Sequence, residues 1–175
     1  MFKKIFLGLL GLLVVGGATL FMLNGSDNYD ASKYNATVTD GLNIGSKIAF
    51  SLPDQFDNKH TLSDSTKVLI LSFTKATGHI IKNFLSQESA EYLPSRDAYF
   101  IADISPMPVV IRNTFALPDL KKSSFSVLLI YDKTIATQIK PQKESEKIVI
   151  VKLNRGVITQ VQYIQTAKEL KAVLK

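Results

Sequence analysis

The sequence predicts an α/β domain, built on a central mixed sheet with helices on both faces and preceded by one N-terminal transmembrane helix. Three observations lead to this fold class. The chain opens with two lysines and a long apolar run. Strand-like and helix-like patterns alternate from residue 44 onward, and the chain ends in a hairpin pattern followed by a capped helix. Strands that alternate with helices favour a sheet that is covered on both sides.

The composition excludes several classes of function. The 175 residues include no cysteine, which rules out structural disulfides, thiol nucleophiles and thiolate metal ligands. The net charge of +6 is spread along the chain rather than gathered in a stripe. Because a nucleic-acid interface typically shows dense basic residues interleaved with aromatics, we expect no nucleic-acid partner.

Residues 1–23 are predicted to form an uncleaved signal anchor. Lys3 and Lys4 precede an apolar run from Ile5 to Leu23. A helix of that length would cover ~28 Å, close to the ~30 Å hydrocarbon core of a bilayer. The lysines favour a cytoplasmic N-terminus, and the end of the run has no small-residue cleavage site. A cleaved signal peptide is the alternative, and either way the rest of the chain lies outside the cytoplasm.

The polar segment 24–43 is rich in Gly, Asn, Asp and Ser and is predicted to be a linker, which leaves residues 44–175 as the folded domain. The domain begins with a short strand, a turn and a second short strand within residues 46–64. The apolar run Val68–Phe73 that follows is typical of a strand buried on both faces.

A helix, a strand and a second helix come next. Thr77 is positioned to cap the first helix, the apolar residues after it recur at helical spacing, and Pro94 closes the segment. Residues 97–105 form a strand pattern. Pro108 and Pro118 then bracket a short helix, with Pro108 at its first position and Pro118 beyond its end.

The C-terminal third returns to strands. Residues 124–139 have a strand pattern, and residues 147–166 hold two more strands around the hairpin signal at residues 154–156. Thr166 and Glu169 then form a capping box, in which each side chain satisfies a free backbone N–H at the start of the last helix.

This order of elements resembles the thioredoxin-like fold. The stretch IGSKIAFSLPDQFDNKHTLSDSTKVLILSF, residues 44–73, resembles the opening of peroxiredoxins and of membrane-anchored thioredoxin-like proteins. Residues 124–175 look similar to the YtfJ-type family of small exported bacterial proteins, with Asp132 after an apolar strand, a turn at Gly156 and a Thr-x-x-Glu-Leu helix start. The resemblance implies a single-pass protein of the bacterial inner membrane with its domain in the periplasm, or a periplasmic or secreted protein if the anchor is cleaved.

The resemblance also implies where a redox site would lie. In redox-active relatives two cysteines come shortly after the central strand, and those places fall at Gly78 and Ile81. The attacking group must be a thiolate, which glycine and isoleucine cannot provide. Relatives also carry a cis-proline before the next-to-last strand, where residues 144–147 contain no proline. Thiol–disulfide exchange and thiol peroxidase activity are therefore excluded, and we assign no catalytic residue.

The leading hypothesis is a non-catalytic protein-binding or envelope-assembly module with a protein partner in the cell envelope. The resemblance implies that a groove beside the helix N-terminus can bind extended polypeptide without thiols. The candidate groove comprises Lys75, Thr77, Gly78, His79, Glu144, Ser145, Glu146 and Lys147. The alternative is an enzyme or small-anion binder that uses the helix N-terminus around Lys75 to His79, because backbone N–H groups there attract anions. In the plainer interpretation Thr77 is only a cap and His79 a surface residue.

Two further interpretations concern residues outside this groove. Met107, just before the proline-bounded helix, and Phe115 within it form a candidate partner surface, although such a segment is more often a helix with rigid ends. His60 lies in a polar turn and is expected to be solvated. With two histidines and no cysteine, the sequence offers too few ligands for a metal site. It contains neither a phosphate-binding loop nor a dinucleotide-binding motif, so we expect no nucleotide cofactor.

Overall fold

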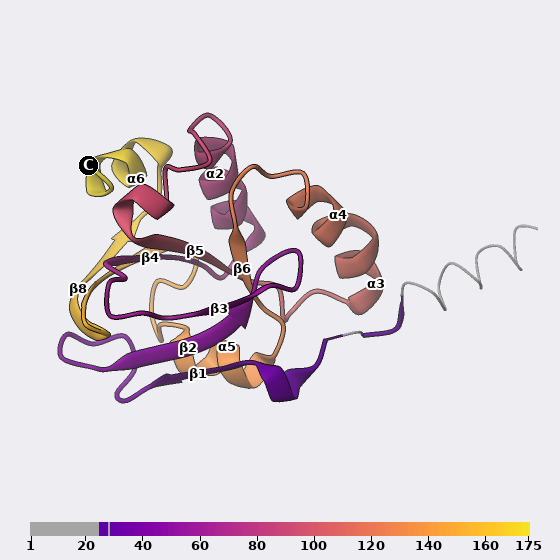
Figure 1. The fold of residues 1–175 in the computed structure, drawn as a ribbon, viewed down its shortest axis with the longest axis horizontal. Helices are drawn as coiled ribbons and strands as arrows, with labels where there is room; N and C mark the ends of the chain where they lie inside the picture. The colour runs from indigo at the N-terminus through magenta and orange to yellow at the C-terminus, as the bar shows by residue number, and fades with distance from the viewer. Residues whose placement is uncertain (1–24, 28) are drawn as a thin grey trace, which may run out of the picture.

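The computed structural model describes residues 25–27 and 29–175, which form two sheets (Figure 1). One sheet has three antiparallel strands in the order β1-β2-β3, and the other has five strands in the order β6-β5-β4-β7-β8. The strands are β1 (Asn35–Val38), β2 (Ile48–Pro53), β3 (Lys59–Thr61), β4 (Val68–Ser72), β5 (Ala98–Asp103), β6 (Val127–Ile130), β7 (Ile148–Asn154) and β8 (Val157–Ile164). The helices are η1 (Ala31–Lys33), α2 (Lys75–Leu85), η2 (Pro94–Arg96), α3 (Val109–Ile111), η3 (Arg112–Ala116), α4 (Leu117–Leu120), α5 (Lys133–Ile139) and α6 (Ala167–Val173).

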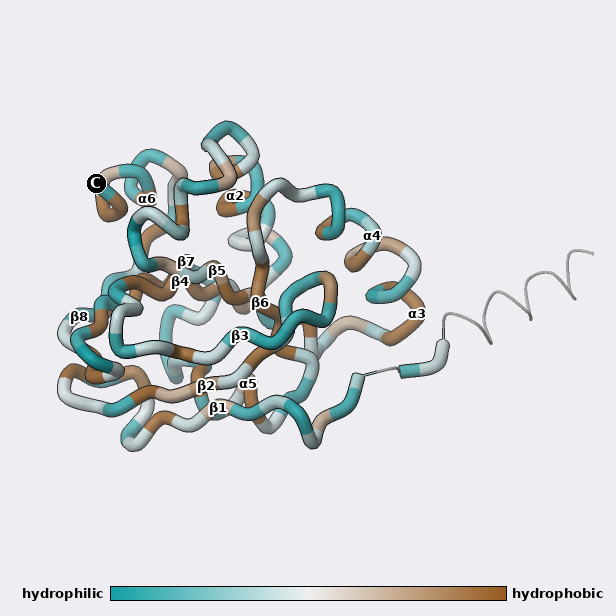
Figure 2. Tube along the Cα trace, in the orientation of Figure 1, coloured by the Kyte–Doolittle hydropathy of each residue, from teal (hydrophilic) through white to brown (hydrophobic). Residues whose placement is uncertain are grey.

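The five-stranded sheet is mixed, as predicted. Its central strand β4 is parallel to β5, and β5 is parallel to β6. β4 is antiparallel to β7, which forms a hairpin with β8. Leu69, Ile70 and Leu71 of β4 are fully buried, because successive side chains of a strand point to opposite faces and both faces of this sheet are covered. Figure 2 shows the hydrophobic colouring of these central strands.

Helices cover both faces of the sheet, which confirms the predicted α/β fold class. On one face, α5 and the three-stranded sheet enclose a core that includes Phe50 and Ile139. On the other face, α2 and α6 pack through Ile81 and Leu170 against the strands.

α2 starts earlier than predicted, and the prediction that Thr77 caps it is wrong. Thr74 is the N-cap, because its backbone is extended and its Oγ1 accepts a hydrogen bond from the Thr77 N–H at 3.3 Å. Thr77 lies inside the first turn and is buried. Both threonines have the chemistry of a cap, so the residue type alone does not distinguish them. Because β4 ends at Ser72 and the connection to α2 is short, the helix begins directly after Thr74, which becomes the N-cap.

The proline-bounded helix is longer than predicted. It runs from α3 through a π-helical stretch, η3, into α4. Pro108 is the N-cap of α3, one position before its predicted place, and Pro118 lies in the first turn of α4 rather than beyond the helix. A proline is tolerated at the start of a helical segment because its missing N–H needs no partner there.

Residues 124–139 do not form one strand. β6 covers only its first part, and α5 follows directly. Asp132 is the N-cap of α5, where its Oδ1 accepts a hydrogen bond from the Thr134 N–H at 2.7 Å. The branched residues of this segment favour a strand by propensity, but the cap and the burial of Ile135, Ala136 and Ile139 against the core stabilise a helix.

The predicted linker over residues 24–43 is wrong for its second half, which belongs to the fold. β1 pairs with β2, so that Ala36 lies opposite Phe50. Tyr34 and Ala36 are both buried. Because β1 turns only one small apolar residue fully inward, its sequence resembles a linker, and the folded part of the chain begins well before residue 44.

The predicted transmembrane segment, residues 5–23, lies outside the described residues. Across residues 25–27 and 29–175, no helix is long and apolar enough to cross a bilayer.

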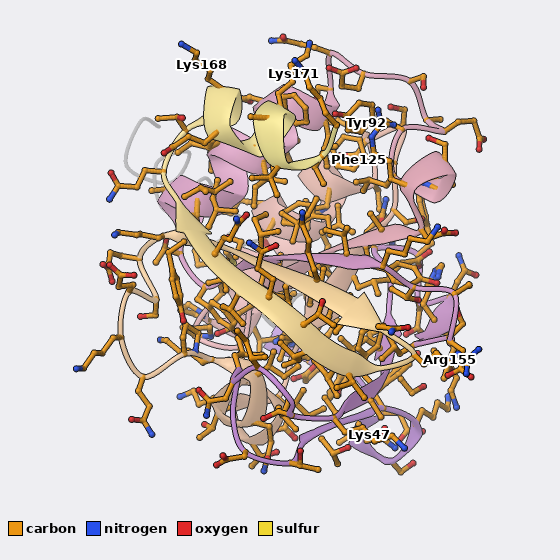
Figure 3. All side chains as sticks on the ribbon, turned by 90° about the vertical axis from the view of Figure 1, so that its left-hand side faces the viewer. Lys47, Tyr92, Phe125, Arg155, Lys168 and Lys171 are labelled. Atoms are coloured by element: carbon orange, nitrogen blue, oxygen red, sulfur yellow. The ribbon has the colours of Figure 1, made fainter. Side chains whose placement is uncertain are left out.

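The three-stranded sheet is attached to the β7–β8 hairpin at one end of β2. The Ile48 N–H donates a hydrogen bond to the Gly156 carbonyl at 2.8 Å. Gly156 has a φ of 74°, and a Cβ there would lie 3.2 Å from the Ile48 carbonyl oxygen, so this turn needs glycine. Figure 3 shows Lys47 and Arg155 at this same end of the molecule.

The C-terminal helix α6 confirms the predicted capping box. Thr166 Oγ1 accepts a hydrogen bond from the Glu169 N–H at 3.2 Å, and Glu169 Oε2 accepts one from the Thr166 N–H at 3.0 Å. The hydrogen bond from the Thr166 side chain is the main reason why the pKa of Glu169 lies below its usual value. Figure 3 shows Lys168 and Lys171 projecting from this helix.

We expect Thr166→Ala to lower the free energy of unfolding by about 1 kcal/mol, because a helix N-terminal N–H loses its acceptor. Urea unfolding followed by circular dichroism would measure this loss. Thr166→Ser keeps the hydroxyl and serves as the matched control. Equal stabilities for the Ala and Ser variants would contradict the importance of this cap.

Candidate functional site

The candidate site lies at the C-terminal end of β4, the central strand of the sheet. β4 is parallel to its neighbour on one side and antiparallel to its neighbour on the other. In open α/β sheets, ligands bind outside the carboxyl ends of the strands, at the point where the chain leaves toward different faces. Only Phe73 and Thr74 separate β4 from α2, so the start of α2 is held close to this end of the strand.

Three hydroxyl groups close the space between β4 and α2. Ser72 Oγ lies 2.9 Å from Thr77 Oγ1, which also lies 2.9 Å from Thr74 Oγ1. Ser72 and Thr77 are 2% and 3% exposed. The predicted groove residue Thr77 therefore has its hydroxyl bound within the protein, and it forms the floor of the site rather than a ligand contact.

The two positions expected to match the cysteines of redox-active relatives face inward. A Cβ built on Gly78 would lie 3.4 Å from Ser72 Oγ, so the inner side of Gly78 contacts the hydroxyl cluster. Ile81 is fully buried in the core beneath α2. Neither position would present a side chain freely to a ligand, although Gly78 itself is half-buried.

Lys75 and His79 are exposed on α2. They are four residues apart and therefore lie on one face of the helix. Among the described residues, no hydrogen bond or ion pair holds either side chain in place. His79 is close enough to Asp119 of α4 to contribute to the lowered pKa of that carboxyl, for which the hydrogen bond from Lys82 is the main cause.

The loop before β7 supplies the other predicted groove residues, Glu144, Ser145, Glu146 and Lys147. Glu144 has a φ of 61°, and its Oε1 accepts a hydrogen bond from Lys147 Nζ at 2.5 Å. This hydrogen bond raises the pKa of Lys147. In the pairing of β4 with β7, Leu71 lies opposite Val149. Continued by two residues, that register sets Phe73 opposite Lys147, so the loop and the start of α2 lie at the same end of β4.

The two halves of the predicted groove lie at the same end of β4 without direct bonds. Within the part of the chain that the structure describes, no hydrogen bond or ion pair joins residues 74–79 to residues 144–147. The loop instead reaches toward the far edge of the sheet, where Glu144 and Glu169 line a shallow hollow of about 460 Å³ beside Tyr163. The loop and the start of α2 are thus not joined by any hydrogen bond or ion pair between these residues.

Of the two residues of the predicted partner surface, only Phe115 is exposed. Met107 is half-buried and packs against the core. Phe115 is 63% exposed, and Ile111, which precedes it by one turn, is 46% exposed. The exposed apolar pair on this helix is therefore Ile111 and Phe115.

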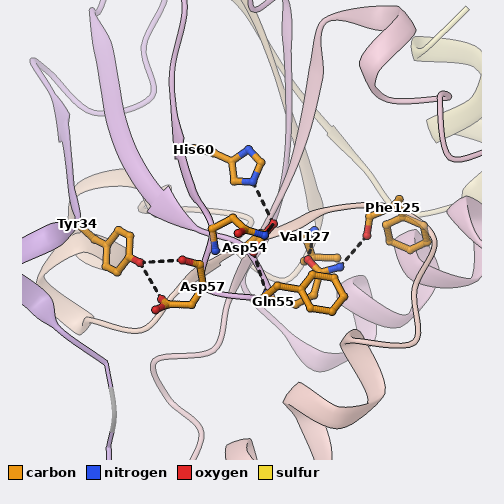
Figure 4. A network of polar contacts seen from close by, with 9 residues as sticks. Tyr34, Asp54, Gln55, Asp57, His60, Phe125 and Val127 are labelled. Carbon is orange, nitrogen blue, oxygen red and sulfur yellow. Dashed lines mark hydrogen bonds and ion pairs between the residues drawn. The ribbon is translucent and has the colours of Figure 1, made fainter.

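A polar cluster that the sequence pattern did not reveal lies in the β2–β3 turn (Figure 4). Asp54 is 3% exposed, and its carboxylate accepts hydrogen bonds from the Phe56 N–H, the Asn58 N–H and the Asn58 side chain at 2.8 to 3.1 Å. His60 Nε2 lies 3.1 Å from Asp54 Oδ2. The prediction that His60 is solvated is wrong, because β3 directs its ring back onto this buried carboxylate. Burial raises the pKa of Asp54, but these hydrogen bonds outweigh it and the net shift is downward.

Gln55, next to Asp54, fastens the same turn to β6. Its Nε2 donates a hydrogen bond to the Phe125 carbonyl at 2.9 Å, and its Oε1 accepts one from the Val127 N–H at 2.8 Å. Gln55 is 3% exposed. The side chain thus replaces a pair of backbone hydrogen bonds at the edge of the five-stranded sheet (Figure 4).

A second cavity, of about 440 Å³, lies next to His60. It is lined by hydroxyl side chains together with Tyr99 and Phe125. Because it includes the residues that precede β4, β5 and β6, it lies at the opposite end of the sheet from the start of α2. The cavity and the candidate groove are therefore separate sites.

The chain also encloses an arginine that the sequence pattern did not single out. Arg112 is 3% exposed, its Nη2 lies 2.6 Å from Asp27 Oδ1, and its guanidinium lies 4.8 Å from the ring centre of Tyr131. Tyr29 stacks between Tyr131 and Tyr34, at 4.7 Å and 5.5 Å. Burial is the main cause that raises the pKa of Tyr131 to about 12. These contacts fasten the start of the described chain onto η3 and the end of β6.

The described residues contain no cluster of His, Asp or Glu side chains that could hold a metal ion. His60 has one carboxylate neighbour, which is too few ligands for a metal centre.

Comparison with solved structures identifies the fold. Neither a family model nor a curated protein matches the chain. A candidate protein disulfide isomerase from Bacteroides thetaiotaomicron aligns with a TM-score of 0.51 and 16% identity over 80% of this chain and 89% of that one. The peroxidoxin BcpB from Mycobacterium tuberculosis aligns with a TM-score of 0.50 and 17% identity over 75% of this chain and 93% of that one. The chain thus has a thioredoxin-like fold and no cysteine.

Proposed function

We propose that this chain is a membrane-anchored, exported thioredoxin-like domain that acts as a non-catalytic protein-binding or envelope-assembly module, related to the YtfJ-type proteins. Residues 5–23 would hold it in the bacterial inner membrane by a single span, with the domain in the periplasm. Cleavage after this segment would give a periplasmic or secreted form instead. The observation that carries the proposal is that the exposed start of α2 and the loop of residues 144–147 lie at the same end of the central strand.

The side chains of this groove are better suited to binding a polypeptide than to catalysing a reaction. Its floor is the cluster of Ser72, Thr74 and Thr77, whose hydroxyls are bonded to one another. Its rim carries exposed Lys75 on one side and exposed Glu146 on the other. Polar groups of both signs around an uncharged floor fit the backbone and side chains of an extended segment.

An enzyme or small-anion binder at Lys75 and His79 remains the alternative. A general base or nucleophile is normally oriented by a second hydrogen-bonding group. Neither side chain has such a partner among the residues that the structure describes, which favours binding over catalysis. The two side chains lie on one exposed face of α2, near its N-terminus, where an anion could bind. Anion binding is therefore the version of this alternative to test.

Site-specific photo-crosslinking in intact cells tests the groove. A photoreactive residue at His79 is expected to give a discrete protein adduct, and one at Lys171 on α6 is expected to give none, because α6 lies away from the start of α2 on the same face. Adducts at neither position, or equal adducts at both, would contradict binding at this groove.

Two variants separate binding from catalysis. Ala76→Trp places a bulky ring on the exposed first turn of α2 and should abolish the adduct formed at His79. Ala76 is preferable to Gly78, whose substitution would also press on Ser72. A His79→Ala variant, probed from Lys75, should keep its adduct if the site only binds protein. Loss of cellular function in His79→Ala with the adduct intact would instead favour the enzyme.

A further inference from the structure

Three consecutive residues after the predicted anchor lie against the α3–η3 helix, and two of them are bonded to it. A Cβ built on Gly25 would lie 3.6 Å from Val110 Cγ2. The Asn113 side chain donates a hydrogen bond to the Ser26 carbonyl at 3.1 Å. The Asp27 carboxylate lies 2.6 Å from Arg112 Nη2. Residues 25–27, the first that the structure describes, therefore lie beside this helix (Figure 1).

Arg112 joins the N-terminal segment to this helix through an ion pair with Asp27. The side chain of Arg112 is 3% exposed, and a buried cation without a counter-charge is strongly destabilising. Asp27 supplies that counter-charge, and Tyr131 supplies an aromatic face at 4.8 Å from the guanidinium. Tyr29, two residues after Asp27, stacks on Tyr131 at 4.7 Å and extends the contact.

The same helical run turns an apolar pair outward. Ile111 and Phe115 are 46% and 63% exposed and lie one turn apart. Phe115 belongs to the π-helical stretch that also turns Arg112 inward, and π-helical segments are frequent at functional sites. Exposed Lys121 and Lys122 follow at the end of α4, and the nearby acid Asp119 is paired with Lys82. The surface is therefore apolar at one end and cationic at the other.

We propose that Ile111, Phe115, Lys121 and Lys122 form a membrane-contact patch, which rests on the surface of an anionic lipid bilayer. This inference rests on the proposed anchor at residues 5–23. Two residues of chain, from Leu23 to Gly25, can span at most about 7 Å. Gly25 lies beside Val110, and the next two residues are bonded to Asn113 and Arg112, so the domain is held with its α3–η3 side close to the bilayer.

The chemistry of the patch matches a lipid surface. Apolar and aromatic side chains insert at the boundary between headgroups and acyl chains, and lysines near them are attracted to anionic headgroups. A soluble protein partner would have to share this side of the domain with the bilayer. The patch would also set the orientation of the domain, with α6 at the end of the molecule away from α3 (Figure 1).

The absence of cysteine makes a direct test possible, because a single introduced cysteine can be labelled alone. The full-length chain would be reconstituted into vesicles of phosphatidylethanolamine and phosphatidylglycerol. Variants Ile111→Cys, Phe115→Cys and, as the control, Lys168→Cys would carry a nitrobenzoxadiazole label. A nitroxide-bearing lipid in the same vesicles should quench the labels at 111 and 115 several-fold more than the label at 168.

The contribution of charge is tested in the same vesicles. Lys121→Ser combined with Lys122→Ser should reduce quenching of the label at 111, and so should vesicles of phosphatidylcholine alone. If neither change reduces quenching, the proposed attraction between these lysines and anionic lipid is overturned.

Failure of the patch and failure of the anchor give different results. A chain that floats with the vesicles while the labels at 111 and 115 are quenched no more than the control overturns the patch and leaves the anchor standing. A chain that does not float overturns both. A protein adduct formed by a photoreactive residue at Phe115, in chains whose label at 111 stays unquenched, would identify a protein interface in place of the bilayer.

Discussion

Asp54→Ala is expected to lower the free energy of unfolding by about 3 kcal/mol. The substitution removes the acceptor for two backbone N–H groups and for the side chains of Asn58 and His60. Hydrogen bonds to a charged acceptor contribute about 1.5–3 kcal/mol each, and buried donors left without a partner add a desolvation cost. Part of this cost is relieved because several of the donors are only partly buried. Guanidinium or urea unfolding of the full chain would measure the difference.

Two other variants serve as a control and as an intermediate case. Asp64→Ala removes an exposed carboxylate without hydrogen bonds in the structure and should change the stability by less than about 0.5 kcal/mol. Asp54→Asn keeps one carbonyl acceptor and should fall between the other two. A stability of Asp54→Ala equal to that of Asp64→Ala would show that the β2–β3 turn does not depend on this carboxylate.

The pH dependence of stability supplies an independent check on Asp54. Its folded pKa lies below the usual value, because hydrogen bonds to the ionised form outweigh burial. A depressed folded pKa contributes stability above the unfolded pKa, about 3.9 for Asp, and the contribution is lost as the pH falls through the folded value. The stability difference between the native chain and Asp54→Ala should therefore be constant near neutral pH and shrink below about pH 4.

Strong local signals in the sequence predict most of the fold. The apolar run Val68–Phe73 predicts the buried central strand, and the spacing of Thr166 and Glu169 predicts the start of α6. Both signals depend on neighbours along the chain. The sequence pattern predicts a strand where α5 lies, because the branched residues there favour a strand, whereas the Asp132 cap and packing against the core stabilise a helix.

The polar contacts of the structure depend on residues that the fold brings together. Gln55 forms its hydrogen bonds with Phe125 and Val127 only when β2 packs beside the edge strand β6. Arg112 meets Asp27 only once the N-terminal segment crosses η3. No spacing rule in the sequence predicts either pair. The candidate groove also combines residues far apart in the chain, so that only the family resemblance, and no residue pattern, suggests it.

Gln55→Ala should lower the free energy of unfolding by about 2–4 kcal/mol. The side chain satisfies the Phe125 carbonyl and the Val127 N–H, both at a buried position, and each group left without a partner costs about 1–3 kcal/mol. Gln138→Ala on the exposed face of α5 is the matched control and should be close to neutral. Equal effects of the two substitutions in urea unfolding would contradict a role for Gln55 in fastening the β2–β3 turn to β6.

Gln55→Glu then separates the two hydrogen bonds. An ionised glutamate can still accept from the Val127 N–H, but it faces the Phe125 carbonyl with an oxygen in place of a donor. Burial and this repulsion raise the folded pKa of the new carboxyl above that of the unfolded chain. The destabilisation should therefore be full above the folded pKa and diminish as the pH falls through it, because the protonated acid can donate to the Phe125 carbonyl. A destabilisation that did not change with pH would mean that the donor half of the Gln55 contact contributes little, and that the Val127 N–H alone holds the turn to β6.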